Sequence, residues 1–159
     1  MLRRSPNPRR AFTFLEVMIV VIMIGILAAI VVPQFGAAKG EATRSALTSS
    51  LGGVRSAIAG YRANQALAGT GNFPTLSELT TPGTVLADDV PPNPYSGLAA
   101  VQSVTAGQAA NRTVINSGAY GWNYFVNNAA SPPVATFYAN SAVSIGTDAT
   151  GATLYANEQ

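Results

Sequence analysis

A single carboxylate within an apolar segment is the residue of this sequence with the clearest chemical meaning. Glu16 lies in the run from Phe12 to Val32, in which Thr13 is the only other clearly polar residue. A charged side chain in the middle of a membrane-spanning helix costs about 2.5–3.5 kcal/mol, so such residues are usually paired and functional. No cation lies in this run, so the partner of Glu16 is expected from a neighbouring chain or from an amine exposed by cleavage nearby. The simpler interpretation is that Glu16 lies near the helix end and reaches the lipid headgroups.

The remaining residues give little support for catalysis. The chain has no Cys and no His, which excludes disulfides, thiolate–imidazole zinc sites, and triads or bases built on histidine. The neighbouring Asp88 and Asp89 would point to opposite sides of an extended chain, and no nucleophile–base pair is evident. The sequence therefore predicts a protein without enzymatic activity, and a membrane-anchored enzyme has no site to support it.

The charge is distributed very unevenly along the 159 residues, a length that suits one domain. The formal net charge is +2, but the first ten residues contain four arginines and no acid. Residues 12–159 contain five Lys and Arg against seven Asp and Glu, a net charge of −2. Charged residues make up only 10% of the chain, which indicates a surface that faces lipid or other subunits. Five scattered basic residues do not form a nucleic-acid site.

The apolar run that contains Glu16 has the length of a membrane-spanning helix. Its 21 residues would extend about 30 Å as an α-helix, which matches one bilayer core. The preceding arginines favour a cytoplasmic N-terminus. A secretory signal peptide cut after Ala38 is the competing interpretation, with Gly36-Ala37-Ala38 as the cleavage site. The length of the run, its glutamate and the helical pattern beyond the cut favour a helix that is retained.

Helical patterning resumes after Pro33, a residue that normally breaks a helix interior. Apolar residues then recur at spacings of three and four, which predicts one buried stripe of an amphipathic helix: Leu47, Leu51, Val54, Ile58 and Tyr61. The glycine-containing segment 68–72 is expected to end this helix.

The chain after residue 70 is rich in turn-forming residues and short β-prone runs. Thr75, followed three residues later by Glu78, predicts the start of a short helix. The proline-rich segment 88–97 is expected to be a rigid connector. Strands are expected at about 98–105, 112–116, 119–126 and 134–140, the last two forming a hairpin. Trp122 and Tyr124 are expected to cover the helix stripe.

The N-terminal junction, Arg9-Arg10-Ala11-Phe12-Thr13-Phe14-Leu15-Glu16, resembles the class III leader junction of type IV pilins and type II secretion pseudopilins. The resemblance implies cleavage between Ala11 and Phe12 by a prepilin peptidase, followed by N-methylation of Phe12. It also implies that Glu16 pairs with the terminal amine of a neighbouring subunit, and that Gly25 and Pro33 locally weaken the helix. Ala11 stands where the family usually has glycine.

The same resemblance predicts an α+β fold, in which a long N-terminal helix packs on a small antiparallel sheet. Its implied organisation is a cleaved leader (1–11), a transmembrane half-helix (12–33), an amphipathic half-helix (34–67) and a globular β-rich domain (68–159). The later segment, with its Pro-Asn-Pro turn and Gly-Trp hairpin, resembles the C-terminal domain of major pseudopilins. Those proteins often bind calcium, which would place a structural calcium ion at Asp88 and Asp89, although a solvated turn explains the two acids equally simply.

The function implied by the resemblance is assembly into a filament. The expected partners are further copies in a helical homopolymer, a prepilin peptidase, an inner-membrane assembly platform and minor pilins or pseudopilins. Before assembly the chain would span the inner membrane once, with its C-terminal domain in the periplasm, and the finished filament would be periplasmic or extracellular. The alternative is a periplasmic or secreted binding module, released after Ala38 or tethered by one helix.

Overall fold

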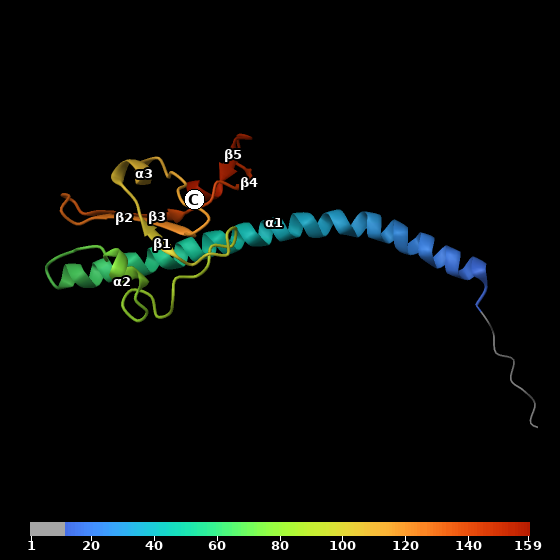
Figure 1. Cartoon of the computed structure of the whole chain (residues 1–159), viewed down its shortest axis with the longest axis horizontal. Coiled ribbons are helices and arrows are strands. Elements are labelled where there is room, and N and C mark those ends of the chain that lie inside the picture. The colour runs from blue at the N-terminus through green and yellow to red at the C-terminus, as the bar shows by residue number, and fades with distance from the viewer. Residues whose placement is uncertain (1–11) are drawn as a thin grey trace, which may run out of the picture. The chain divides into compact units, whose positions relative to one another are not determined.

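The computed structural model describes residues 12–159, which begin with one long helix, α1 (Phe14–Leu67) (Figure 1). The predicted leader, including Ala11, lies outside the described residues. Pro33 lies inside α1, which continues past it as the resumed pattern predicted. Contacts divide the chain into two compact units, Met1–Lys39 and Gly40–Gln159, so the two parts of α1 are described separately.

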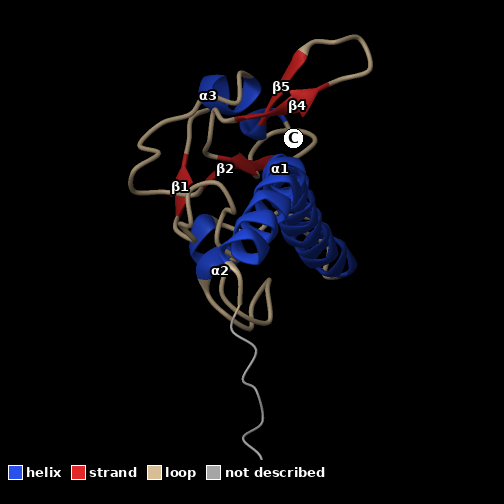
Figure 2. Cartoon of the chain, turned by 90° about the vertical axis from the view of Figure 1, so that its right-hand side faces the viewer, coloured by secondary structure: helices blue, strands red, loops and turns tan. Residues whose placement is uncertain are grey.

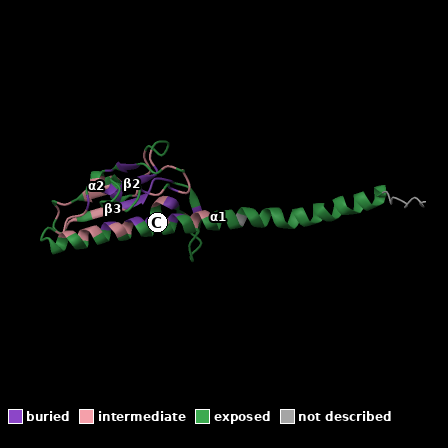
Figure 3. Ribbon diagram, turned by 90° about the horizontal axis from the view of Figure 1, so that it is seen from below, coloured by how far each residue is buried: buried purple, intermediate pink, exposed green. Residues whose placement is uncertain are grey.

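In the described part of the first unit, the large apolar side chains of the helix are exposed. From Phe12 to Phe35, every large apolar side chain is at least 42% exposed. Figure 3 shows this part of α1 as exposed throughout. An 18-residue window of α1 has a mean hydropathy of 3.0, so α1 is long and apolar enough to cross a membrane. An apolar surface of this size in water would drive aggregation, so it needs lipid or other protein around it.

A Schellman motif ends α1 at Leu67, directly before the segment expected to end it. The N–H of Thr70 donates to the carbonyl of Gln65 at 3.0 Å, and the N–H of Gly69 donates to that of Ala66 at 3.0 Å. Gly69 has φ +89°, the left-handed conformation that this motif requires and that glycine adopts without strain.

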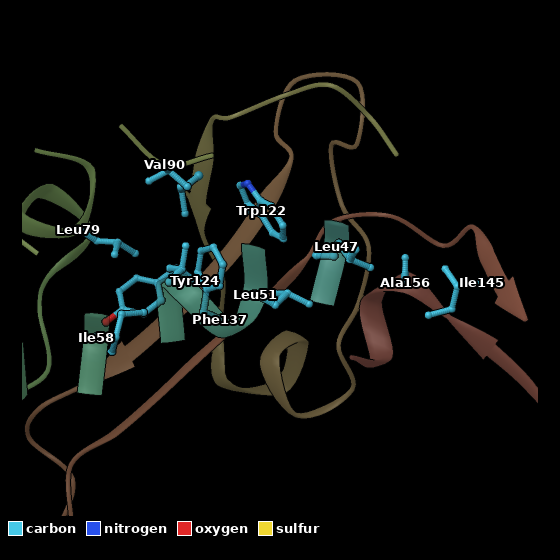
Figure 4. Close-up of a cluster of buried hydrophobic side chains, with 13 residues drawn as sticks. Leu47, Leu51, Ile58, Leu79, Val90, Trp122, Tyr124, Phe137, Ile145 and Ala156 are labelled. Atoms are coloured by element: carbon cyan, nitrogen blue, oxygen red, sulfur yellow. The ribbon is translucent and has the colours of Figure 1, made fainter. Parts of the chain in front are cut away.

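The second unit buries the predicted stripe of α1 in its core. Leu47, Leu51, Val54 and Ile58 are each at most 5% exposed, whereas Tyr61 is only half-buried. Figure 4 shows that aromatic side chains from the sheet meet these residues, which confirms the expected role of Trp122 and Tyr124. Burying one such aliphatic side chain stabilises the fold by about 1.5–3 kcal/mol.

Three strands form the sheet that packs on α1, in the order β1 (Val101–Ser103), β2 (Trp122–Asn127) and β3 (Val134–Ala139). β2 and β3 form the predicted antiparallel hairpin, with Tyr124 opposite Phe137. β1, however, runs parallel to β2, so the sheet is mixed and not wholly antiparallel. A parallel pair needs a crossover connection, and the long segment between β1 and β2 provides it.

The prediction of a strand at 112–116 is wrong, because the structure has no strand at these residues. The crossover contains a short helix, α3 (Ala106–Ala110), which begins with a capping box between Thr105 and Gln108. The irregular segment that follows is held by buried side chains: Ile115 exchanges hydrogen bonds of 3.0 and 2.6 Å with the Asn140 amide. Side-chain amides therefore satisfy this segment's main chain in place of a strand partner.

The helix predicted from Thr75 and Glu78 is confirmed as α2 (Leu76–Thr80), with both capping-box bonds present. Hydrogen bonds from the Thr75 hydroxyl and N–H, and from the Tyr61 hydroxyl, hold the pKa of Glu78 below its usual value. Two short strands at the end of the chain, β4 (Ser144–Thr147) and β5 (Thr153–Tyr155), form a separate antiparallel pair that the sequence analysis missed, and a 3₁₀ turn, η1 (Ala156–Glu158), follows them.

A close backbone contact joins the proline-rich connector to the start of β2. The Trp122 indole N–H donates to the carbonyl of Pro91 at 2.7 Å, and the Asn93 side-chain amide donates to that of Gly121 at 2.8 Å. A Cβ added at Gly121 would lie 1.8 Å from the carbonyl oxygen of Leu98, so only glycine fits there. The connector is therefore fixed to the core at several points.

Candidate assembly site at the start of the apolar helix

Thr13 and Glu16 form a reciprocal pair of hydrogen bonds at the start of α1. The Glu16 Oε2 atom accepts from the Thr13 N–H and hydroxyl, each at 3.0 Å, and the Glu16 N–H donates to Thr13 Oγ1 at 3.2 Å. This is the capping-box arrangement, with Thr13 as N-cap and Glu16 three residues later. Such a cap stabilises a helix by about 1 kcal/mol.

The cap also orients the carboxylate. Because Glu16 lies in the first turn, its negative charge faces the positive end of the helix dipole, a favourable position. A carboxylate has two acceptor oxygens. Only Oε2 is used by the cap, and within residues 12–159 no hydrogen bond to Oε1 is found. The site therefore holds a fixed, half-satisfied carboxylate that can accept from an amine.

Phe12 and the apolar positions of the first turns surround this carboxylate. Phe12 is 87% exposed and immediately precedes the cap, while Phe14, Leu15 and Val17 are exposed as well. Because apolar side chains exclude water, a charge-assisted hydrogen bond to Glu16 would be stronger here than on a polar surface. The arrangement is chemically suited to binding a cation through Glu16 Oε1.

Gly25 and Pro33 do not belong to the same cluster. At 1.5 Å per residue they lie about 13 Å and 25 Å along α1 from Glu16. Gly25 has open space around the position of a Cβ, so close packing within this chain does not require a glycine there. Any effect of the two residues would act on the helix itself, through the hydrogen bond that proline lacks and the backbone freedom of glycine.

The predicted calcium ligands, Asp88 and Asp89, lie elsewhere, in the exposed loop between α2 and β1. In the described part of the chain no group of three or more Asp, Glu, His or Cys side chains is placed to hold a metal. The carboxylate of Asp148 is already hydrogen-bonded within its own turn. Its Oδ1 accepts from the N–H and hydroxyl of Thr150 and from the N–H of Ala152. Calcium binding at Asp88 and Asp89 stays a prediction.

Thr13 is the residue of the candidate site that the sequence analysis did not predict. Its signal was present, because threonine followed three residues later by glutamate, before an apolar run, is the sequence pattern of a capping box. The same pattern occurs at Thr75 and Glu78, where it predicts the start of α2.

Comparison with known proteins finds a family motif over the part of the chain that contains Thr13 and Glu16. Residues 6–32 match the family described as the prokaryotic N-terminal methylation motif. The chain is also similar to type II secretion system core protein G of Escherichia coli K12, with 32% identity over 48% of this chain and 58% of that protein. With the protein of the same name from Klebsiella michiganensis, the identity is 39% over 34% of this chain and 38% of that protein.

The matches thus span less than two thirds of either relative, and no solved structure matches the chain significantly. The methylation motif covers the capped start of α1, and the relatives are pseudopilins of the same kind as the leader junction indicates. These similarities support a relationship between this chain and the pilins and pseudopilins.

Proposed function

We propose that this protein is a structural subunit of a pilus or pseudopilus filament, most similar to those of type II secretion systems. The observation that carries the proposal is the uncovered apolar start of α1. There the Thr13 cap holds one oxygen of Glu16, and the other oxygen has no partner in the described chain. A helix with this surface needs lipid first and other helices later, which is the requirement of a subunit that leaves a membrane for a filament.

The proposed processing follows from the methylation motif. A prepilin peptidase would cut between Ala11 and Phe12 on the cytoplasmic side and methylate the new amine of Phe12. Cleavage removes the four arginines at 3, 4, 9 and 10, so the side chains of residues 12–159 carry a net charge of −2. It also places a cationic amine one residue before the Thr13 cap.

The proposed assembly step pairs that amine with Glu16 of a neighbouring subunit. Lipid tails are as apolar as the helix, so the hydrophobic effect contributes little to helix association in the membrane. An unpaired carboxylate or ammonium is costly there, so the pairing fixes the register of one helix on the next. The Thr13 cap supports this role because it holds Oε2 and leaves Oε1 to the incoming amine.

The proposed location before assembly is the inner membrane, with residues 12–33 as the span and the second unit in the periplasm. The partners would be further copies, the peptidase, an assembly platform and minor subunits. A binding module released after Ala38 is not favoured, because the methylation motif and the relatives both point to a retained helix.

Expression of the chain together with a type II or type IV assembly machinery is expected to give filaments that contain it. Shearing of the cells, electron microscopy and immunogold labelling of the second unit measure this directly. Omission of the assembly ATPase is the control and should remove the filaments. Finding the chain only as a soluble periplasmic monomer would contradict the proposal.

A further inference from the structure

The outer edge of β3 is an edge of the sheet with which no strand of residues 12–159 pairs. The strand order is β1-β2-β3, so β3 has a hydrogen-bonded neighbour on one side alone. Figure 2 shows β1 on one side of β2 and the C-terminus on the other, where η1 lies beside β3. An edge strand presents main-chain groups that can pair with a strand of another molecule, so proteins usually protect such edges.

The register of the sheet shows which groups of β3 face this edge. The N–H of Val104 donates to the carbonyl of Tyr124 at 3.1 Å, so the main-chain groups of Tyr124 face β1. Phe137 lies opposite Tyr124 in the antiparallel ladder, and the two therefore form a pair without mutual hydrogen bonds. The main-chain groups of Phe137, and those of Ala135 two residues earlier, point away from β2 to the free edge.

One of these outward groups is occupied by a side chain of α1. Arg55 donates from Nε and Nη2 to the carbonyl of Phe137, at 3.1 and 2.9 Å. Nη2 also donates to the main-chain oxygen of Gln159, which helps to fix the guanidinium group in position. A second strand would need the same carbonyl to extend the sheet. Arg55 therefore occupies the place of a strand partner at the middle of the edge.

The space beside the edge is otherwise open. Residues of β3 and α1 line a cavity of about 340 Å³ here, among them Ala135, Thr136, Phe137, Arg55, Ile58 and Ala59. Ala135 and Thr136 are half-buried. Within residues 12–159 the N–H groups of Ala135 and Phe137 and the carbonyl of Ala135 have no hydrogen-bond partner outside the strand pairing. Arg55 is thus the side chain that protects an edge with pairing capacity left.

We propose that Arg55 prevents the β3 edge of one copy from pairing with the β3 edge of another copy. Antiparallel pairing of two such edges would form a two-fold symmetric contact through the outward groups of Ala135 and Phe137. With Arg55 present, the Phe137 carbonyl of each copy is already bound, and a guanidinium group lies where the second strand would approach. The second units therefore stay separate. The inference goes beyond the proposed function and does not depend on it, because it concerns the chain before any assembly.

Arg55→Met removes every donor of this side chain and keeps much of its apolar stem. The full chain with this substitution should form dimers in mild detergent with a dissociation constant at least tenfold lower than that of the unsubstituted chain. Analytical ultracentrifugation measures this constant. Arg62→Met is the matched control, because Arg62 also lies on α1 and donates to a main-chain oxygen, that of Gly71 at 3.3 Å, but does not contact β3. The control should dimerise no more than the unsubstituted chain.

A second substitution separates edge pairing from association through partial unfolding. Ala135→Pro removes an outward N–H and leaves the bonds between β2 and β3 in place, because the Ala135 N–H faces the free edge. Added to Arg55→Met, it should return the dissociation constant to within about threefold of the unsubstituted value. Unchanged dimerisation of Arg55→Met would overturn the inference, and so would dimerisation that persists in the double variant.

Fluorescence of the buried Trp122 shows whether each variant is folded. If Arg55→Met does not fold, Arg55→Gln decides the question, because the glutamine amide nitrogen takes the place of Nε and can keep one of the two bonds to Phe137. This variant should dimerise at least threefold more tightly than the unsubstituted chain, and an unchanged constant would overturn the inference. Filament yield is not a readout here, so the proposed function and this inference fail separately.

Discussion

Glu16→Val is expected to leave the chain in the membrane but to reduce filament yield at least tenfold. Valine makes the apolar run more hydrophobic, so insertion does not suffer. The substitution removes the acceptor for the neighbouring amine, which is then left as an unpaired charge among apolar helices, at a cost of several kcal/mol. Membrane fractionation measures insertion, and quantification of sheared filaments measures assembly.

Thr13→Ala separates the helix cap from the proposed pairing. It removes the hydroxyl that bonds Glu16 but keeps the carboxylate, so the helix should lose about 1 kcal/mol of capping. Filament yield should therefore fall much less than with Glu16→Val. If the two variants assemble equally poorly, the cap and not the pairing explains the role of Glu16. Normal filaments from Glu16→Val would refute the pairing.

Gly121→Ala is expected to destabilise the second unit by about 3 kcal/mol, at the upper end of the usual cost of overpacking. The added methyl would meet the carbonyl oxygen of Leu98 at 1.8 Å and its carbon at 2.8 Å, and the main chain cannot move aside as a flexible side chain would. Relief of the clash must separate the connector from β2 and disturb the bond from Trp122 to Pro91.

Denaturant unfolding of the mature chain in detergent, followed by tryptophan fluorescence, measures this loss. Gly118→Ala is the matched control, because a Cβ at Gly118 has nothing within 4 Å and its φ is not in the left-handed region. It should change the free energy of unfolding by less than about 0.5 kcal/mol. Equal stability of the two variants would show that the connector and β2 do not approach as closely as described.

Local patterns in the sequence accounted for the elements whose stability is local. The stripe from Leu47 to Ile58, the end of α1 at Leu67 and the cap at Thr75 each depend on residues within a few positions of one another. Spacing and residue type are sufficient evidence for such features. The β2–β3 hairpin was predictable for the same reason, since its strands are neighbours along the chain.

Features that depend on distant partners could not be predicted in this way. The parallel pairing of β1 with β2 is set by the crossover between them, and the segment 112–116 is held by Asn140 from beyond β3. The candidate site shows the same division. Glu16 was evident from its apolar neighbours, whereas spacing alone does not fix which carboxylate oxygen the Thr13 cap uses.

Mass spectrometry of the N-terminal peptide of the membrane-bound or filament-bound protein is the most direct test of the proposed function. The proposal predicts a mature chain that begins with N-methylated Phe12, so that a cationic amine precedes the Thr13–Glu16 cap. Substitution of Ala11 by a bulky residue such as leucine should block this processing and leave the precursor intact. A mature chain that begins at Lys39 would contradict the account, because the capped apolar start of α1 would then be discarded before the protein acts.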